Sequence, residues 1–477
     1  MPRRSQPVAR GVMIALLAAA LGTPAAANEQ DARGGPEEVA APPNILFILT
    51  DDQSYDAIPH TPAVLSYLEG RINNPSDRWQ RFTRNYLNTP LCCPSRASIF
   101  TGRYSHHTGV NTNGDGKKLD ESSTIATWLN GAGYRTGLVG KYLNGYPWNR
   151  GHYVAPGWDY WAVQEGASDL YYNYKLNLNG TVIDHAAAPE DYSTDVLRDH
   201  ALDFLDTGSP SDPFMLFFAP NAPHSPRLRA PRHSTAWNTA TPVRNPSFNE
   251  ADVSDKPQWV RNRPVMGASA VKKQDRFRRN QYGTLVAVDE AIADLIGEIE
   301  AQGQLANTII VFTTDNGFSF GEHRWSGKLC VYLSCSAAPL YIRYPQGPNA
   351  TRSGLVSNVD LAPTLAALAG VTPATSVDGV SLVPLLNGTA SSVREDVLLR
   401  WVGNRNVTAY WGLRNANYTY AEYETGEVEL YDLTGVLGPA DPDELVNKCP
   451  GLPAVCQPAY AGVRSELSAR LAALKSA

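Results

Sequence analysis

Acidic and amide side chains directly follow two apolar segments that have the composition of buried strands. The run Ile45–Leu49 stops at Asp51 and Asp52, and the run "TIIVFTT" stops at Asp315 and Asn316. An acid pair at a strand end is more often a helix cap or a solvated turn, but here the same chemistry recurs at two strand ends. Three carboxylates and an amide oxygen suit a hard cation such as calcium. The predicted calcium ligands are Asp51, Asp52, Asp315 and Asn316.

Basic residues occur in loops of the sequence, for example within "GLVGKYLN", "APHSP" and "GEHRWSGK". Each of them taken alone is most often a surface charge or an ordinary loop histidine. Several cations around a metal, however, form a site for an anionic group such as sulfate or phosphate. The residues concerned are Arg96, Arg103, Lys141, His224, His323 and Lys328.

Helical and strand-like segments alternate along most of the chain and must position these side chains. "STDVLRDHALDFLD" is helical, and "PFMLFFAPNAPHSP" is a strand followed by a Pro-rich loop. The order predicts an α/β fold whose large, mostly parallel sheet is flanked by helices. Ligands of such sheets gather outside the carboxyl ends of the strands. The polar strand ends at 51–52, 221–224 and 315–316 should therefore converge on one site.

The last part of the chain has a different character. "VLLRWVGNRNVTAYWGLRNANYTYAEYETGEVELYDL" is aromatic, polar and hairpin-like, with Thr425-Gly426 as a turn, and "GVRSELSARLAALKS" is helical. These segments predict a smaller C-terminal antiparallel sheet with a closing helix. We place the catalytic domain at 43–385 and the smaller α+β domain at 386–477.

The first residues predict export. A basic start is followed by a short apolar run from Gly11 to Gly22 and by small residues ending at Ala27, which is the pattern of a secretory signal peptide. We predict a signal peptide at 1–27, cleaved after Ala27, and a disordered lead-in at 28–42. No later segment approaches the ~20 apolar residues of a membrane helix, so we expect a secreted or periplasmic protein. The net charge of −6 and the lack of a long basic run give no reason to expect a nucleic-acid partner.

Two adjacent cysteines open the segment "CCPSRASIFTGR". The pattern Cys92-x-Pro-Ser-Arg-x-x-x-x-Thr-Gly-Arg resembles the signature of the type I, formylglycine-dependent sulfatases of the alkaline phosphatase-like superfamily. "LTDDQ", "GKYLN", "APHSP" and "TTDNG" also appear in the order expected for that family. Within it, the chain looks most like N-acetylglucosamine-6-sulfatases and bacterial arylsulfatases.

This resemblance implies a mechanism for hydrolysing a small-molecule or glycan sulfate ester. Cys92 is expected to be oxidised to formylglycine by a formylglycine-generating machinery, and a hydroxyl of the hydrated aldehyde would attack sulfur beside calcium. Arg96 is expected to orient the hydrate. The residues expected to bind the sulfate and the leaving oxygen are Lys141, His224 and Lys328.

Two further residues, Asn144 and His323, are expected to contact the substrate. Many sulfatases have a histidine soon after the lysine of "GKYLN", where this chain has Leu143 and Asn144. An asparagine there can hydrogen-bond but cannot relay a proton.

The other cysteines form two local pairs. Cys330 and Cys335 are close in sequence, as are Cys449 and Cys456, and an exported protein permits both disulfides. Cys93 is then left over, and we expect it to be buried as a small apolar group.

Two other functions remain open at this stage. The same fold and metal site serve phosphodiesterases and phosphonate monoester hydrolases, some of which also use formylglycine. Alternatively, the chain is a catalytically silent binding protein, because Cys92 stays unmodified or because Leu143 and Asn144 impair the site.

Overall fold

The computed structural model describes residues 41–57, 63–166, 170–209 and 211–476. The predicted signal peptide and the lead-in up to residue 40 lie outside these ranges. The chain from residue 41 onward forms one compact unit. Within the described ranges, no helix combines the length and the apolar character needed to cross a bilayer.

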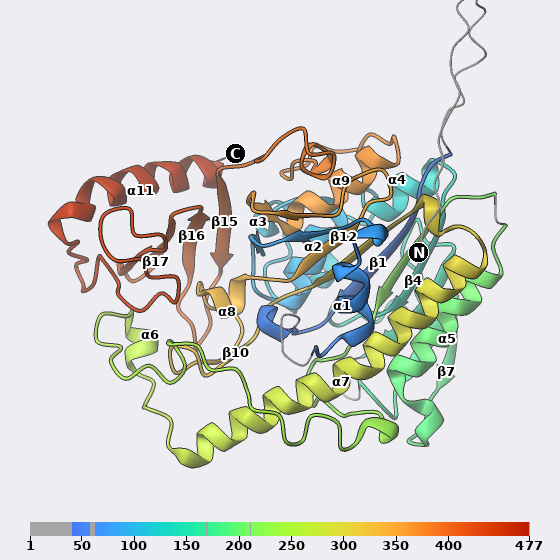
Figure 1. The fold of residues 1–477 in the computed structure, drawn as a ribbon, viewed down its shortest axis with the longest axis horizontal. Coiled ribbons are helices and arrows are strands. Elements are labelled where there is room, and N and C mark those ends of the chain that lie inside the picture. Colours follow the sequence, from blue (N-terminus) through green and yellow to red (C-terminus); the bar gives the residue numbers. More distant parts are fainter. Residues whose placement is uncertain (1–40, 58–62, 167–169, 210, 477) are drawn as a thin grey trace, which may run out of the picture. The chain divides into compact units, whose positions relative to one another are not determined.

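The largest element of the fold is a ten-stranded mixed sheet (Figure 1). Its central strands, in the order β9-β1-β8-β4-β5, are all parallel. Antiparallel pairs occur toward both edges, at β12 and at β6 and β7. The predicted mostly parallel sheet is therefore confirmed. In spatial order the strands are β13 (Ala350–Arg352), β2 (Trp79–Phe82), β12 (Leu340–Arg343), β9 (Thr308–Thr314), β1 (Asn44–Thr50), β8 (Phe214–Ala219), β4 (Arg135–Gly140), β5 (Tyr160–Glu165), β6 (Lys175–Leu178) and β7 (Thr181–Asp184).

Both faces of the sheet are covered by helices, which explains the continuous apolar sequence of its central strands. Successive side chains of a strand point to opposite faces, so Phe47 joins one apolar core and Leu46 the other. In Figure 1 the long helix α7 runs beside α5 on the face that α1 also covers. On that face lie α1 (Ser66–Asn73), α5 (Ser193–Asp206) and α7 (Ala268–Ala301). On the other lie α2 (Cys92–Thr101), α4 (Ile125–Gly131), α9 (Leu361–Leu368) and α10 (Val383–Leu386).

The C-terminal part forms the predicted antiparallel sheet and helix. Four strands follow one another as a meander, with the turn at Thr425-Gly426 between the last two. Leu467 and Leu471 of the closing helix pack against Leu413 and Leu430 of the sheet. The elements are β15 (Asp396–Trp401), β16 (Tyr410–Asn415), β17 (Tyr418–Tyr423), β18 (Val428–Asp432) and α11 (Ala461–Ser476). The domain boundary at 385/386 stays a prediction.

Short elements complete the fold. Two small two-stranded sheets pair β10 (Ser319–Phe320) with β11 (Ser326–Gly327), and β3 (Asn85–Tyr86) with β14 (Val356–Ser357). The short helices are α3 (Ser105–Thr108), α6 (Gln258–Arg261) and α8 (Leu333–Ser336).

Both predicted disulfides are present in the structure. Cys330 is bonded to Cys335, and Cys449 is bonded to Cys456. Cys92 and Cys93 are free and buried, so the expectation that Cys93 is a packed thiol is also confirmed.

Candidate active site

The two acidic strand ends lie side by side because β1 and β9 are parallel neighbours with Thr50 opposite Thr314. The next residues of each strand therefore leave the sheet at the same edge. The backbone N–H of Asp52 donates to Asp315 Oδ1 at 3.3 Å. Asn316 Nδ2 donates to Asp52 Oδ1 at 2.7 Å. All four predicted metal ligands are buried.

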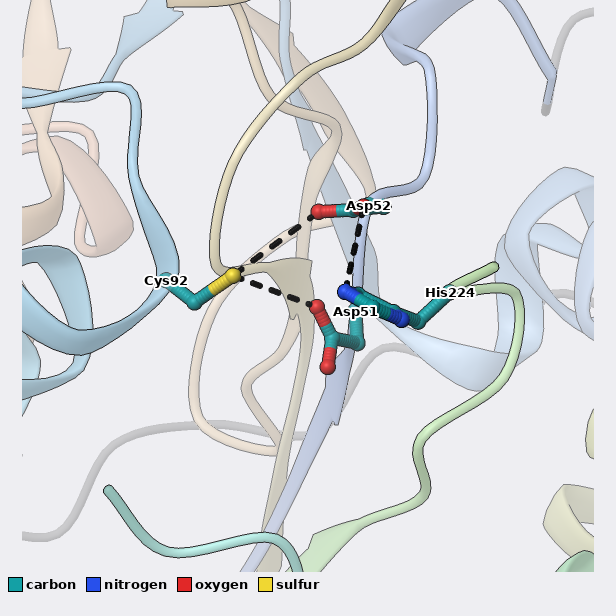
Figure 2. A group of neighbouring side chains, drawn as sticks. All are labelled: Asp51, Asp52, Cys92 and His224. Carbon is teal, nitrogen blue, oxygen red and sulfur yellow. Dashed lines mark hydrogen bonds and ion pairs between the residues drawn. The ribbon is translucent and has the colours of Figure 1, made fainter. Parts of the chain in front are cut away.

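Cys92 reaches this group from the first residue of α2. Pro94 is tolerated in the first helical turn, where backbone N–H groups have no partner inside the helix. The helix ends at Thr101 and is capped by Gly102, which has a left-handed φ of 68° and donates its N–H to the Ser98 carbonyl. Figure 2 shows Cys92 pointing toward the two acids, with Sγ 3.6 Å from Asp51 Oδ1. The positive end of the helix thus faces the site, where it favours negative charge.

Arg96 lies one turn further along α2 and ties three segments together. Its Nε donates to Asp315 Oδ2 at 2.7 Å, and its Nη1 donates to the Lys141 carbonyl at 2.7 Å. Its Nη2 lies 3.9 Å from Asp51 Oδ2. The guanidinium is fully buried and therefore fixed in orientation by these partners.

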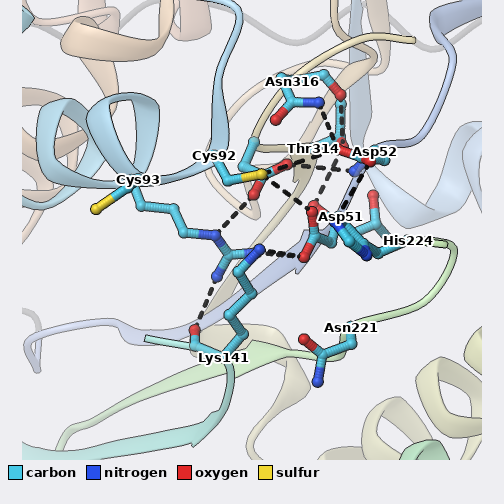
Figure 3. Close-up of polar contacts among 12 residues, drawn as sticks. Asp51, Asp52, Cys92, Cys93, Lys141, Asn221, His224, Thr314 and Asn316 are labelled. Atoms are coloured by element: carbon cyan, nitrogen blue, oxygen red, sulfur yellow. Dashed lines mark hydrogen bonds and ion pairs between the residues drawn. The ribbon is translucent and has the colours of Figure 1, made fainter. Parts of the chain in front are cut away.

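Lys141 and His224 follow the two parallel strands β4 and β8. Gly140 has a φ of 121°, and a Cβ atom there would lie 2.1 Å from the Ala219 carbonyl oxygen, so the close approach of the strand ends requires glycine. Lys141 Nζ donates to Asp51 Oδ2 at 2.5 Å. His224 Nε2 lies 3.6 Å from Asp52 Oδ2 (Figure 3). The predicted convergence of the strand ends includes His224 in the segment 221–224, whereas Lys141 is predicted only as a loop cation.

Lys328 enters from a loop that follows β11. Its Nζ lies 2.8 Å from Cys92 Sγ and also forms an ion pair with Asp52. The carbonyl of Lys328 accepts a hydrogen bond from Trp325 Nε1 at 2.8 Å, which fixes the loop backbone. The structure thus brings together nine of the predicted site residues: Asp51, Asp52, Cys92, Arg96, Lys141, His224, Asp315, Asn316 and Lys328.

Acids and cations in this group shift one another's pKa values. Burial disfavours the ionised form of Asp51, but the surrounding cations, Lys141 first among them, together outweigh it and hold the pKa below its usual range. The pKa of Asp52 is lowered in the same way, burial being outweighed by Lys328 together with other cations. Asp315 differs, because burial and then the charge of Asp51 raise its pKa.

The unmodified Cys92 thiol is held in its neutral form. Burial raises its pKa to about 12, although Lys141 and Lys328 oppose the shift. Since the thiolate is the nucleophilic form of cysteine, an unmodified Cys92 is a poor nucleophile at neutral pH.

The oxygen atoms at the strand ends have the chemistry of a divalent metal site. Asn316 Oδ1 is buried and has no hydrogen-bond partner among the residues that the structure describes. Ligand atoms of Asp51, Asp52, Cys92 and His224 lie within 4.8 Å of one another. Carboxylate oxygens with an amide oxygen left unsatisfied fit a hard cation.

Cys93 has surroundings different from those of its neighbour. Figure 3 shows its side chain directed away from the carboxylates. It belongs to the apolar core beneath α2 with Ala97 and Phe100, and its N–H donates to Asn113 Oδ1 at 3.1 Å. The two adjacent thiols therefore lie in different surroundings: Cys92 faces the carboxylates, and Cys93 packs in the apolar core.

The remaining predicted residues lie in different places. Asn144 lines a small cavity beside Lys141 and His224, and its Oδ1 is buried without a partner in the described structure. His323 lies apart from the group, buried against Tyr332 and bonded through Nδ1 to Glu250 Oε2 at 2.7 Å. This position gives no support to direct substrate contact by His323. Arg103 lies beyond the far end of α2.

Two residues near the site were not found from the sequence. Gln164 lines the same cavity as Asn144 and stands near the end of β5, a strand that we did not predict. Glu121 bonds the residue that follows Lys141: its carboxylate accepts hydrogen bonds from Tyr142 at 2.8 Å and from Tyr153 at 2.6 Å. A prediction of β5 would have identified Gln164, because ligands gather at the carboxyl ends of the strands in such sheets. No sequence signal marks Glu121.

Glu121→Ala should lower the free energy of unfolding by about 1–3 kcal/mol, because the buried Tyr142 hydroxyl loses its acceptor. Since Tyr142 directly follows Lys141, kcat should fall as well. Chemical denaturation and steady-state kinetics measure the two effects. Tyr142→Phe is the matched control and should be milder in both. Equal stability of Glu121→Ala and the wild type would contradict this role.

Comparison with known protein families agrees with this geometry. Residues 43–371 match the family described as "Sulfatase". The chain belongs to the sulfatase family. Residues 321–477 also match "N-sulphoglucosamine sulphohydrolase, C-terminal". The protein is therefore a sulfuric ester hydrolase, and its expected membership of this family is confirmed.

Individual sulfatases show the same relationship over most of the chain. Human N-acetylglucosamine-6-sulfatase is 35% identical over 456 residues, covering 85% of this chain and 80% of that protein. The N-acetylglucosamine-6-O-sulfatase of Bacteroides thetaiotaomicron is 28% identical and covers 90% and 85%. A solved structure described as a complex with its substrate D-glucosamine-2-N,6-O-disulfate superposes with a TM-score of 0.78 at 25% identity, covering 91% of this chain and 98% of that one.

Proposed function

We propose that this sulfatase is exported and hydrolyses the sulfate esters of sugars such as N-acetylglucosamine 6-sulfate. The observation that carries the proposal is the buried Cys92, which contacts Asp51, Asp52 and Lys328 at one edge of the sheet. The substrate class is supported by the names of the related sulfatases. The export signal lies outside the described residues, and secretion or a periplasmic location remains part of the proposal.

Calcium is the metal that we propose for the oxygen ligands. Asp51, Asp52, Asp315 and Asn316 would hold it, and the unsatisfied Asn316 Oδ1 supports this assignment. When bound, the ion would neutralise sulfate oxygens and acidify a neighbouring hydroxyl.

Position 92 supplies the nucleophile in this proposal. The maturation machinery would convert the thiol to formylglycine, whose hydrate offers one hydroxyl for attack on sulfur and a second for release of sulfate. Arg96 would keep the backbone of the site in place, because it bonds both Asp315 and the Lys141 carbonyl.

The cations would bind the substrate and move the proton. The Lys141 and Lys328 ammonium groups would donate to sulfate oxygens, which carry the negative charge of the ester. His224 has the most exposed side chain among the three, at 27%, and would protonate the departing alcohol oxygen through Nε2. Asn144 and its cavity would contact the alcohol part of the ester.

A turnover panel tests the substrate class. We expect hydrolysis of N-acetylglucosamine 6-sulfate to exceed that of an aryl sulfate, and both to exceed that of a phosphate diester or a phosphonate monoester. Released sulfate or phosphate is measured at matched concentrations. Faster phosphonate hydrolysis would favour the alternative enzyme class. The lack of any turnover with Cys92 converted would favour a binding protein.

A further inference from the structure

One buried arginine, Arg227, lacks the hydrogen-bond acceptors that the other buried arginines of the described structure have. Five arginines are buried in the described part of the chain. Arg96, Arg278 and Arg414 each form an ion pair with a carboxylate, and Arg343 donates to two backbone carbonyls. The fifth, Arg227, is 4% exposed, and its Nε and Nη2 are buried without an acceptor among the described residues.

Aromatic rings surround the guanidinium of Arg227. Its Cζ lies 4.5 Å from the ring centroid of Phe318, 5.3 Å from that of Phe320 and 5.8 Å from that of Phe277. Contact with aromatic faces compensates part of the cost of removing a cation from water. These contacts give Nε and Nη2 no acceptor within the described structure, so the guanidinium retains its capacity to bind an anion.

The position of Arg227 places this cation beside the active site. The backbone N–H of Arg227 donates to the His224 carbonyl at 3.0 Å. This hydrogen bond closes a turn and keeps the Cα atoms of Arg227 and His224 within about 7 Å. Phe318 stands two residues after the metal-ligand candidate Asn316. Burial lowers the pKa of Arg227, and Asp52 is the first of the groups that oppose the shift. An arginine remains charged despite such a shift.

An unpaired buried charge is destabilising, since an ion loses its hydration on burial and regains the free energy only through a partner. We infer that Arg227 is an oxyanion-binding residue of the active site, whose guanidinium binds a sulfate group of the substrate. That group is either the reacting ester or a second sulfate on the same sugar. The inference rests on the proposed function for the identity of the anion, and it adds a cation that the sequence motifs do not include.

Binding of inorganic sulfate tests this inference without turnover. The converted, metal-loaded enzyme is titrated with sulfate by calorimetry. Arg227→Met, which removes the charge and retains the length, should weaken sulfate binding by roughly 10- to 100-fold. Arg227→Lys should lose less. Arg229→Met is the matched control, because Arg229 lies on the same loop and bonds only neutral oxygens in the described structure.

Thermal unfolding separates binding from a structural role. Arg227→Met should melt at or above the wild-type temperature, because it removes an unpaired buried charge. A lower melting temperature with unchanged ligand binding would show a structural role and overturn the inference. If Arg227→Met does not fold, Arg227→Gln and Arg227→Lys provide the same comparison.

Two sugars identify which sulfate is bound. The KM values of glucosamine 6-sulfate and glucosamine 2-N,6-O-disulfate are compared in the wild type and in Arg227→Met. A rise for both sugars assigns the residue to the reacting ester, and a rise for the disulfate alone assigns it to the second group. Unchanged KM values together with unchanged sulfate affinity overturn the inference. Wild-type turnover of the sugars tests the proposed function separately.

Discussion

Cys92→Ala should abolish turnover, with kcat reduced by roughly 10⁴-fold or more, because no hydroxyl remains at the position that attacks sulfur. Cys92→Ser retains one hydroxyl but lacks the second. It should therefore attack once and remain trapped as a sulfated serine. Intact-protein mass spectrometry after incubation with substrate measures this adduct, and the Cys92 peptide of the active wild type should carry aldehyde in place of thiol.

The neighbouring thiol is the internal control for this experiment. Cys93 lies in the apolar core, so Cys93→Ser should retain substantial activity and lose about 1–3 kcal/mol of stability if its hydroxyl is unpaired. Normal turnover by Cys92→Ala would contradict the proposed nucleophile. So would a modification found on Cys93 instead of Cys92.

Removal of the metal should have the second largest effect. Chelation should reduce kcat by at least roughly 100-fold, because the oxygen ligands at both strand ends would lose the cation that neutralises the substrate. Calcium should restore activity better than zinc, since the four proposed ligand residues all offer oxygen atoms. Full activity in the presence of chelator would contradict a metal site.

Asp315→Ala tests one proposed ligand directly. It should lose activity while the chain remains folded, because Asp315 stands at a strand end outside the apolar cores. Circular dichroism and thermal unfolding monitor the fold. Asp315→Asn, which retains the shape without the charge, is the comparison variant. Loss of the folded state in both variants would instead indicate a structural role, since Arg96 would lose its ion pair.

The sequence was sufficient to predict the architecture and the centre of the site. Ile45–Leu49 is apolar throughout because both faces of β1 are covered, and parallel neighbours must end at the same edge of the sheet. Asp51 and Asp315 therefore had to lie close together, although 264 positions separate them in the sequence.

Residues whose roles depend on packing between distant segments could not be predicted. The state of Arg227 depends on Phe277 and Phe318, which come from other parts of the chain. His323 shows that closeness in sequence to a site residue does not place a side chain in the site. It is only five positions from Lys328 in sequence, yet its left-handed φ of 49° accompanies a side chain that is bonded to Glu250 and not to the site.

The pairing of β1 with distant strands sets an order of events during synthesis. β1 is hydrogen-bonded to β8 and β9, and β9 ends roughly 220 residues after Cys92. At about 5–20 residues per second, the ribosome needs about 10–40 s to produce that stretch. During this interval the "CCPSR" segment has no completed sheet edge to pack against, whereas in the folded chain the Cys92 side chain is fully buried. Slower translation or delayed folding should therefore increase the fraction of chains in which position 92 is modified.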